Sequence, residues 1–248
     1  PTHASGSLGL GIPGSPRVRR IEASHPPARS SGLRGQNERM EAERMDGGAE
    51  RFEAALRAAG AQHFGREVWE ELFQRYGESW RHYHTLDHVA DCLERLDAWK
   101  SLAQRPEVEL ALWFHDAIYV TWKGSNEEKS AELASRRLEA LGVPAERRER
   151  IASYILATGT HEPADGDLGL LLDLDLSILG APADRFDLYE QQIRGEYAFV
   201  PRPLSRRKRR ALLQELLARP TIFNHPPIRA ALEAQARENL QRLIDQLG

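Results

Sequence analysis

Apolar residues recur with the three-to-four-residue period of an amphipathic helix from about residue 48 to the C-terminus, and this pattern limits the fold more than any other feature of the chain. No segment alternates with a period of two for long enough to predict a strand. We therefore predict an all-α single domain of about eight to ten helices. The expected helices span 64–76, 86–99, 108–117, 127–141, 145–157, 168–179, 183–197, 206–218 and 228–247.

Two local details accompany this pattern. Phe64, Val68 and Leu72 share one apolar face of segment 64–76, which predicts that they pack against the core. Asn126 directly precedes segment 127–141, and asparagine is a favourable N-cap residue for a helix.

Three stretches of the chain combine histidine with aspartate: residues 83–88, the pair His115-Asp116, and residues 173–175. Imidazole and carboxylate together suit a divalent metal of borderline hardness, such as Mn, Fe, Co, Ni or Zn. A metal ion held by such groups lowers the pKa of a coordinated water, which makes a nucleophile accessible near neutral pH. These stretches therefore predict a metal-dependent hydrolase.

The spacing within the stretches restricts how they can meet. His84 and His88 are four residues apart, so they share one face if both lie on a helix. Neighbours such as His115 and Asp116 diverge by about 100° within a helix. Both can address one site only near a helix end, or if the metal lies between their directions. A helical bundle allows three such distant segments to converge on one ion.

With these motifs the chain resembles the HD-domain superfamily of metal-dependent phosphohydrolases, whose signature is a His, a His-Asp pair and a distant Asp on helices around one site. The resemblance begins at about Tyr83 and extends to the C-terminus, and it is marked for a bacterial group identified only as predicted HD-superfamily phosphohydrolases. It implies a helical bundle and an HD-type domain over residues 46–248. Segments 113–117, 126–131, 172–180 and 194–197 carry the similarity to the bacterial group.

The resemblance also implies roles for individual residues. Residues 83–91 are similar to the signature of cyclic-nucleotide phosphodiesterases, in which the first His donates a proton to the leaving group. His84 would then be the catalytic acid, with a phosphate-binding, supporting or capping role as the alternative. Similar Asp-x-Asp segments use their second carboxylate, which favours Asp175 over Asp173. The implied metal ligands are His88, His115, Asp116 and Asp175.

The number of metal ions and the group that positions the water stay open. Relatives with two metals usually supply two extra histidines between the His-Asp pair and the final Asp, whereas this chain has only His161 there. One ion per chain is therefore favoured, with His161 lining the pocket or contacting phosphate, although Glu127 could replace the missing ligand. In some one-metal relatives an acid after the His-Asp helix positions the attacking water. Glu127 or Glu128 could do so, but the dipole of the helix that they open also explains them.

The basic run at residues 206–210 is expected to form the first turn of an amphipathic helix, where cations oppose the helix dipole. One or two of its arginines could therefore contact a phosphate. The run lacks the interleaved aromatic residues of a stacking surface, so we do not expect nucleic-acid binding. Arg81, Lys123 and Lys129 could neutralise a substrate phosphate, but we expect each to be a solvated surface charge. Spacing assigns no role to three residues that match the bacterial group, Arg194, Glu196 and Tyr197.

Composition favours a cytoplasmic protein. The net charge of −3 gives no reason to expect an anionic membrane as a partner, and Cys92, the only cysteine, excludes an intrachain disulfide. Apolar runs such as 168–172 fall far short of the about 20 residues that span a bilayer. Residues 1–45 are predicted to be a disordered tail. An over-extended start upstream of Met40 or Met45 explains that tail better than a transit peptide does.

The sequence thus predicts a metal-dependent phosphohydrolase, a phosphomonoesterase or phosphodiesterase. Its expected partner is a small phosphorylated substrate, a nucleotide or another metabolite, and homo-oligomerisation is left open. Two alternatives remain. One is a non-catalytic regulatory protein that binds a metal or a nucleotide. The other is an iron oxygenase on the same scaffold, against which the shortage of histidines argues.

Overall fold

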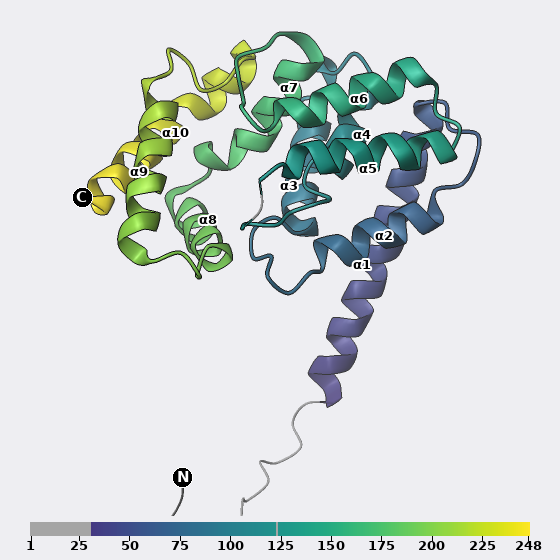
Figure 1. Ribbon diagram of the computed structural model, residues 1–248, viewed down its shortest axis with the longest axis horizontal. Coiled ribbons are helices and arrows are strands. Elements are labelled where there is room, and N and C mark those ends of the chain that lie inside the picture. The colour runs from purple at the N-terminus through teal and green to yellow at the C-terminus, as the bar shows by residue number, and fades with distance from the viewer. Residues whose placement is uncertain (1–30, 123) are drawn as a thin grey trace, which may run out of the picture. The chain divides into compact units, whose positions relative to one another are not determined.

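The computed structural model describes residues 31–122 and 124–248, and over these residues the protein is all-helical, with ten α-helices, two short 3-10 helices and no strand (Figure 1). The predicted all-α fold of about eight to ten helices is thereby confirmed. None of the described helices is long and apolar enough to cross a membrane. The elements are α1 (Ser31–Ala58), α2 (Arg66–Tyr76), α3 (Leu86–Ala98), η1 (Lys100–Leu102), α4 (Glu107–Phe114), α5 (Asn126–Ala140), α6 (Ala145–Ala157), α7 (Gly166–Asp175), η2 (Leu176–Gly180), α8 (Ala183–Glu196), α9 (Arg202–Ala218) and α10 (Pro226–Leu247).

The chain divides into two compact units, Pro1–Glu41 and Ala42–Gly248. Of the predicted disordered tail, residues 1–30 lie outside the described residues. Residues 31–45 form the backbone of the first part of α1. The second unit contains every element from α2 to α10.

Helix α4 lies at the centre of this unit. All its residues except Glu109 are buried, and it packs against α3, α5, α6 and α7. Apart from Glu107 and Glu109 in its first turn, α4 is apolar on every side, and such a helix is stable only inside a protein, which explains this position. The predicted segment 108–117 ends early, because α4 stops at Phe114 and leaves His115 and Asp116 at its C-terminal end.

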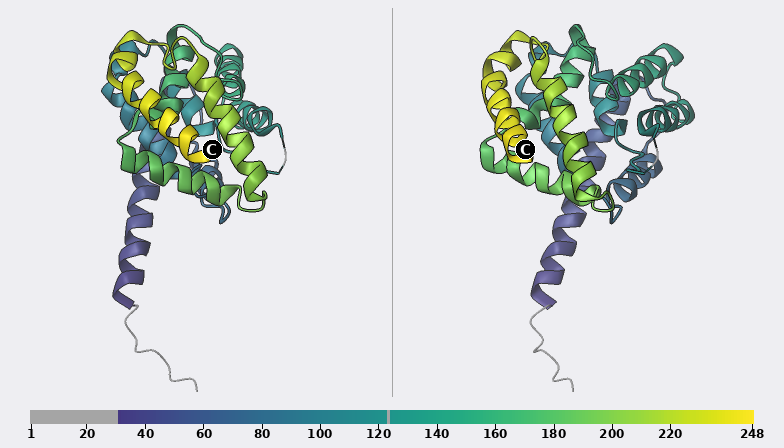
Figure 2. Two further views of the ribbon diagram at one scale, coloured as in Figure 1. Left: turned by 90° about the vertical axis from the view of Figure 1, so that its left-hand side faces the viewer. Right: turned by 60° about the vertical axis from the view of Figure 1, so that its left-hand side comes forward.

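The C-terminal helices are joined to this core through η2, which contacts α7, α8 and α10. The buried amide of Asn239 on α10 donates hydrogen bonds to the carbonyl oxygens of Leu179 and Ala181. Gly180 allows this approach, since a Cβ there would lie 2.6 Å from the Cβ of Leu232. Helices α9 and α10 lie alongside each other (Figure 2).

Three local predictions were wrong. Phe64 is 80% exposed, because α2 begins at Arg66 and Phe64, which precedes it, is not on the buried face of the helix. Asn126 does not cap α5: its Oδ1 accepts a hydrogen bond from the amide of Val120, and Ser125, at a φ of 66°, precedes the helix instead. Helix α9 begins at Arg202, so the basic run at 206–210 lies beyond the first turn.

The aromatic core of the unit gives a stability prediction. Phe52 is fully buried, with its ring centroid 6.1 Å from that of Trp69 and 6.0 Å from those of Trp113 and Phe114. We expect Phe52→Ala to lower the free energy of unfolding by about 3–5 kcal/mol, because it removes this packing and leaves a cavity. Urea denaturation would measure the loss.

Phe64→Ala is the matched control, since it deletes the same atoms from an exposed position. It should change the free energy of unfolding by no more than about 0.5 kcal/mol. Equal losses of unfolding free energy in the two variants would contradict the burial of Phe52.

Candidate metal centre

Four side chains from the ends of three helices meet at one point. His88 lies in the first turn of α3, which begins after Thr85, whose hydroxyl accepts a hydrogen bond from the amide of Asp87. His115 and Asp116 follow the last residue of α4, and Asp175 is the last residue of α7. The helix end lets the adjacent His115 and Asp116 face one site, which the interior of a helix would prevent.

The distances within this cluster fit a common ion. His88 Nε2 lies 3.1 Å from His115 Nε2, 3.1 Å from Asp175 Oδ1 and 3.7 Å from Asp116 Oδ2. His115 Nε2 lies 3.0 Å from Asp116 Oδ2 and 3.6 Å from Asp175 Oδ1. Tetrahedral ligands about 2.0–2.1 Å from a zinc ion are about 3.3 Å from one another. These buried His and Asp side chains could therefore hold a divalent metal ion.

Neighbouring groups contact the rings of both histidines in the cluster. His115 Nδ1 lies 2.8 Å from the carbonyl oxygen of Leu112, to which it donates, so that its Nε2 is the atom that faces the cluster. Cys92, four residues after His88 on α3, places its Sγ 3.8 Å from His88 Nδ1 and 3.7 Å from the carbonyl oxygen of Leu174. Burial raises the pKa of the Cys92 thiol, which favours the neutral form.

Two groups of donor atoms within the described residues are close enough to hold an ion, and both contain His88. The first consists of His88, His115 and Asp116, and the second of His88, Cys92 and Asp175. His88 is common to both groups, so they overlap. The structure thus brings the four implied ligands together and adds Cys92, whose thiol the sequence reasoning did not consider as a donor.

The charges of the cluster favour a cation. Burial alone would lower the pKa of His115, but the carboxylates of Asp116 and Asp175 raise it well above its ordinary value of 6.5. Burial opposes ionisation of both carboxyls, yet His115 holds the pKa of each below its ordinary range. The carboxylates that attract a proton to His115 would equally attract a divalent ion, so proton and ion compete for the site.

Asp173 has a different position. Its carboxylate is fully buried and accepts hydrogen bonds from the backbone amides of Asn224 and His225 and from both of their side chains. Burial raises the pKa of Asp173, against the effect of these hydrogen bonds. The carboxylate therefore anchors the segment before α10 and does not face the cluster.

His84 lies in the turn before α3, so it does not share a helix face with His88, as a continuous helix would require. Its Nδ1 is 2.7 Å from Oε2 of Glu196 at the end of α8, and its ring stacks on Tyr119 with the centroids 4.0 Å apart. Oε1 of Glu196 accepts hydrogen bonds from the amides of His82, Tyr83 and His84. Glu196 therefore fixes both the turn and the ring of His84.

Arg81 holds the same turn from the other side. Its guanidinium donates to the carbonyl oxygens of His84, Asp116 and Ala117. The side chain is completely buried, so the expectation of a solvated charge was wrong. Lys129 is half-buried and donates to the carbonyl oxygen of Gly124, and Lys123 lies outside the described residues. Arg81 thus joins the turn of His84 to the His-Asp segment.

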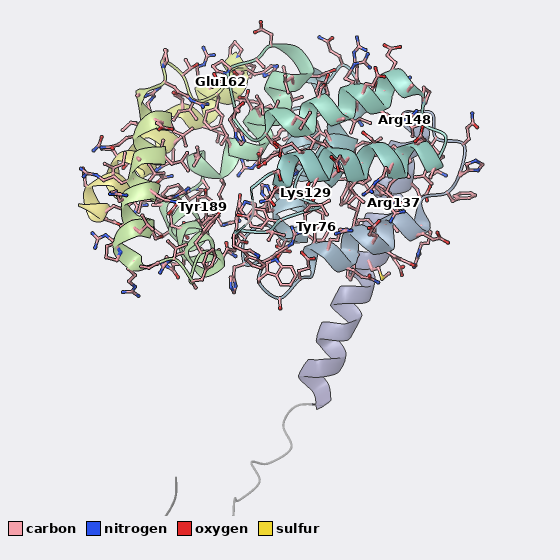
Figure 3. All side chains as sticks on the ribbon, in the orientation of Figure 1. Tyr76, Lys129, Arg137, Arg148, Glu162 and Tyr189 are labelled. Atoms are coloured by element: carbon pink, nitrogen blue, oxygen red, sulfur yellow. The ribbon has the colours of Figure 1, made fainter. Side chains whose placement is uncertain are left out.

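The cluster opens into a cleft of about 1240 Å³. The side chains of Asp116 and Asp175 are 15% and 14% exposed, whereas those of His88 and His115 are 2% and 1% exposed, so only the carboxylates reach the cleft. Tyr189, which Figure 3 labels on α8, lies in its wall.

Three of the other candidate residues also line this cleft. They are His84, Glu127 and His161. His161 Nε2 lies 2.8 Å from Asp175 Oδ2, the oxygen that does not face His88. Glu128 is exposed and is not part of the lining, so Glu127 is the better placed of the two acids.

Three features of the site were missed by sequence reasoning. They are the hydrogen bonds from His84 to Glu196, the buried guanidinium of Arg81 bound to backbone carbonyls, and the thiol of Cys92 beside His88. Comparison of the chain with protein-family models, with curated proteins and with solved structures gave no match.

The two aspartates at the end of α7 provide a matched pair for metal binding. We expect Asp175→Asn to weaken the binding of Mn²⁺ or Zn²⁺ at least about tenfold, because it removes a charged donor. Asp173→Asn should leave the metal affinity unchanged and lower the free energy of unfolding by about 1–3 kcal/mol, since it disturbs buried hydrogen bonds. Isothermal titration and urea denaturation would measure the two effects. Equal metal affinities in the two variants would contradict the assignment of Asp175.

Glu196 predicts a pH dependence of stability. Burial alone would raise the pKa of its carboxyl, but hydrogen bonds from His84 and the backbone lower it from 4.5 to about 2. A pKa that is lower in the folded state stabilises the fold above the unfolded value, and this stabilisation disappears as the pH falls towards the folded value. Between about pH 4.5 and pH 2, wild type should therefore lose up to about 3 kcal/mol more of its unfolding free energy than Glu196→Gln does. Urea denaturation at each pH would measure the unfolding free energies of wild type and Glu196→Gln. If the two fall in parallel between about pH 4.5 and pH 2, this prediction is wrong.

Proposed function

We propose that this protein is a metal-dependent phosphohydrolase that acts on the phosphate ester of a nucleotide or another small phosphorylated metabolite. The observation that carries the proposal is the cluster of His88, His115, Asp116 and Asp175, which opens into a cleft beside a histidine held by a buried carboxylate. The motif resemblance to HD-domain phosphohydrolases supports the same chemistry, as an analogy.

His88, His115, Asp116 and Asp175 would hold the ion, and one ion per chain agrees with the single position that they share. A divalent ion bound there would supply Lewis acidity and lower the pKa of a coordinated water. The protein's own side chains would donate the proton and orient the attacking water.

His84 is the proton donor to the departing oxygen in this proposal. Its Nδ1 is bound to Glu196, which leaves Nε2 as the nitrogen available to a substrate. Histidine is the side chain that most often acts as a general acid near neutral pH. Glu127 lines the cleft and is the candidate to orient the attacking water. His161, bound to the outer oxygen of Asp175, holds that carboxylate in place.

One observation favours a second candidate. His88, His115 and Asp116 form a group of two histidines and one carboxylate, which is also the ligand set of non-haem iron oxygenases. The fourth donor, Asp175, and the acid His84 favour the hydrolase. Visible absorbance of the iron-loaded protein and oxygen-dependent turnover would distinguish the oxygenase.

The test combines metal content with activity. Purified wild type should contain about one transition metal ion per chain and hydrolyse at least one member of a phosphate-ester panel, as expected of a site with one open position. His115→Ala/Asp116→Ala should lose both properties. His84→Asn should keep the metal and lose about 10²–10⁴-fold in kcat, because it removes only the acid. Elemental analysis and phosphate release would measure these quantities.

The outcomes separate the candidate functions. Metal with no turnover on any ester would favour a non-catalytic regulatory protein or the oxygenase. If wild type neither contains metal nor takes it up on titration, the proposal is wrong. If His84→Asn retains full activity, the hydrolase stands but the acid is another group.

A further inference from the structure

One face of α9 forms a wall of the cleft. Arg202, Ser205, Arg206 and Arg209 recur at intervals of three and four residues and all line it. This is the spacing of a single helix face. Lys208 also lines the cleft, so three residues of the basic run that the proposed reaction left unexplained belong to the site: Arg206, Lys208 and Arg209.

Most of the cations in this wall lack a carboxylate partner. Arg209 is paired with Glu190, whose side chain is 15% exposed, and Asp187 is paired with Arg242 outside the wall. Arg206 donates to the backbone carbonyls of Gln246 and Leu247, and within the described part of the chain it has no ion pair with a carboxylate side chain.

Two further cations of the wall have no partner at all. Among the described residues, Arg202 and Lys208 have no ion pair and no side-chain hydrogen bond, and both are exposed to the cleft. Arg202 is also the first residue of α9, and the first turn of this helix contains no acid. A cation there opposes the helix dipole, and an anion bound beside it would offset this cost.

The cleft carries charges of both signs. Asp116, Glu127 and Asp175 also line it, and carboxylates of this kind suit a metal ion. An ester whose only phosphate binds at the metal would leave the cations of α9 without a counterpart. The volume of about 1240 Å³ is also larger than the about 300–1,000 Å³ of ordinary small-molecule pockets.

Aromatic side chains also line the cleft. Tyr119, which stacks on His84, has its hydroxyl 3.5 Å from that of Tyr197. Tyr197 stacks on Phe199, with 6.3 Å between the ring centroids, and Phe199 is 56% exposed. These rings provide a surface for a planar group such as a nucleobase.

We propose that the α9 wall, centred on Arg202 and Lys208, is a second anion site, and that the substrate carries a second phosphate group besides the one to be hydrolysed. This inference rests on the proposed function for the identity of the reacting phosphate, but the anion site itself does not require the metal. Its expected ligand is a bisphosphorylated metabolite with a ring between the phosphates.

The first test measures the anion site alone. Inorganic pyrophosphate is titrated into full-length protein that has been treated with EDTA, and binding is followed by isothermal titration at low and high salt. Arg202→Gln/Lys208→Gln should weaken binding about tenfold or more, and wild-type affinity should fall as salt is raised. Arg207→Gln is the matched control, since Arg207 is exposed on the same helix and does not line the cleft.

The second test concerns the ligand. Metal-loaded wild type should bind adenosine 3′,5′-bisphosphate at least about tenfold more tightly than AMP, and the double variant should lose this preference. Pyrophosphate affinity that is equal in wild type and the double variant would overturn the inference, as would equal affinity of wild type for the two nucleotides. A variant that fails to fold would be recognised by its circular dichroism, and the single variant Lys208→Gln would replace it.

The failure of this inference can be distinguished from that of the proposed function. Asp175→Asn removes a metal donor and should leave the binding of pyrophosphate to metal-free protein unchanged. If the protein takes up no metal but binds pyrophosphate through Arg202 and Lys208, the anion site stands while the hydrolase is wrong. If it takes up metal and hydrolyses esters but shows no such binding, only the second site is wrong.

Discussion

The convergence of two carboxylates with two imidazoles at a nearly buried point is the constraint on which this structure depends. His115 and His88 lie within 3.0–3.7 Å of the oxygens of Asp116 and Asp175, and His115 is the largest cause that lowers the pKa of both carboxyls against the effect of burial. The arrangement requires α3, α4 and α7 to present specific ends to one another, and Arg81 and Glu196 hold the adjoining turn in place. Burying an unpaired charge would be costly. The central helices can therefore pack in this way only if the charged groups of the cluster are paired.

The fold and the residues that meet in the cluster were accessible from the sequence, because helical period and the His and Asp motifs are both local patterns. Helical period and closing glycines depend on neighbours a few residues apart, and the predicted segments 86–99 and 145–157 closely match α3 and α6. Helix geometry alone predicted that an adjacent His-Asp pair lies near a helix end or has the metal between the directions of its two side chains. The boundaries that failed, at Phe64, Asn126 and Arg202, lie where tertiary contacts or turn geometry decide.

The supporting contacts could not be predicted, because they join residues that are distant in the sequence. Glu196 is 112 residues from His84, and no local pattern relates the two. Arg81 was expected in solvent since most arginines are exposed, yet three backbone carbonyls and the carboxylate of Glu78 satisfy its buried guanidinium. The thiol of Cys92 lies beside His88 because they are four residues apart on α3, so helix periodicity could have revealed it. The pairing of Asp173 with His225 had no such signal.

Asp173 and Asp175 show how the two ends of the cleft are connected. Two residues apart on a helix, their side chains diverge by about 200°, so one can face the metal cluster only if the other faces elsewhere. Asp173 uses that direction to bind the backbone of Asn224 and His225, directly before α10, and α10 packs against α9. The last turn of α7 thus fixes one carboxylate in the cluster and, through α10, supports the helix that carries Arg202 and Lys208. A bundle built in this way can set the spacing between the cluster and the cations of α9 without any direct contact between them.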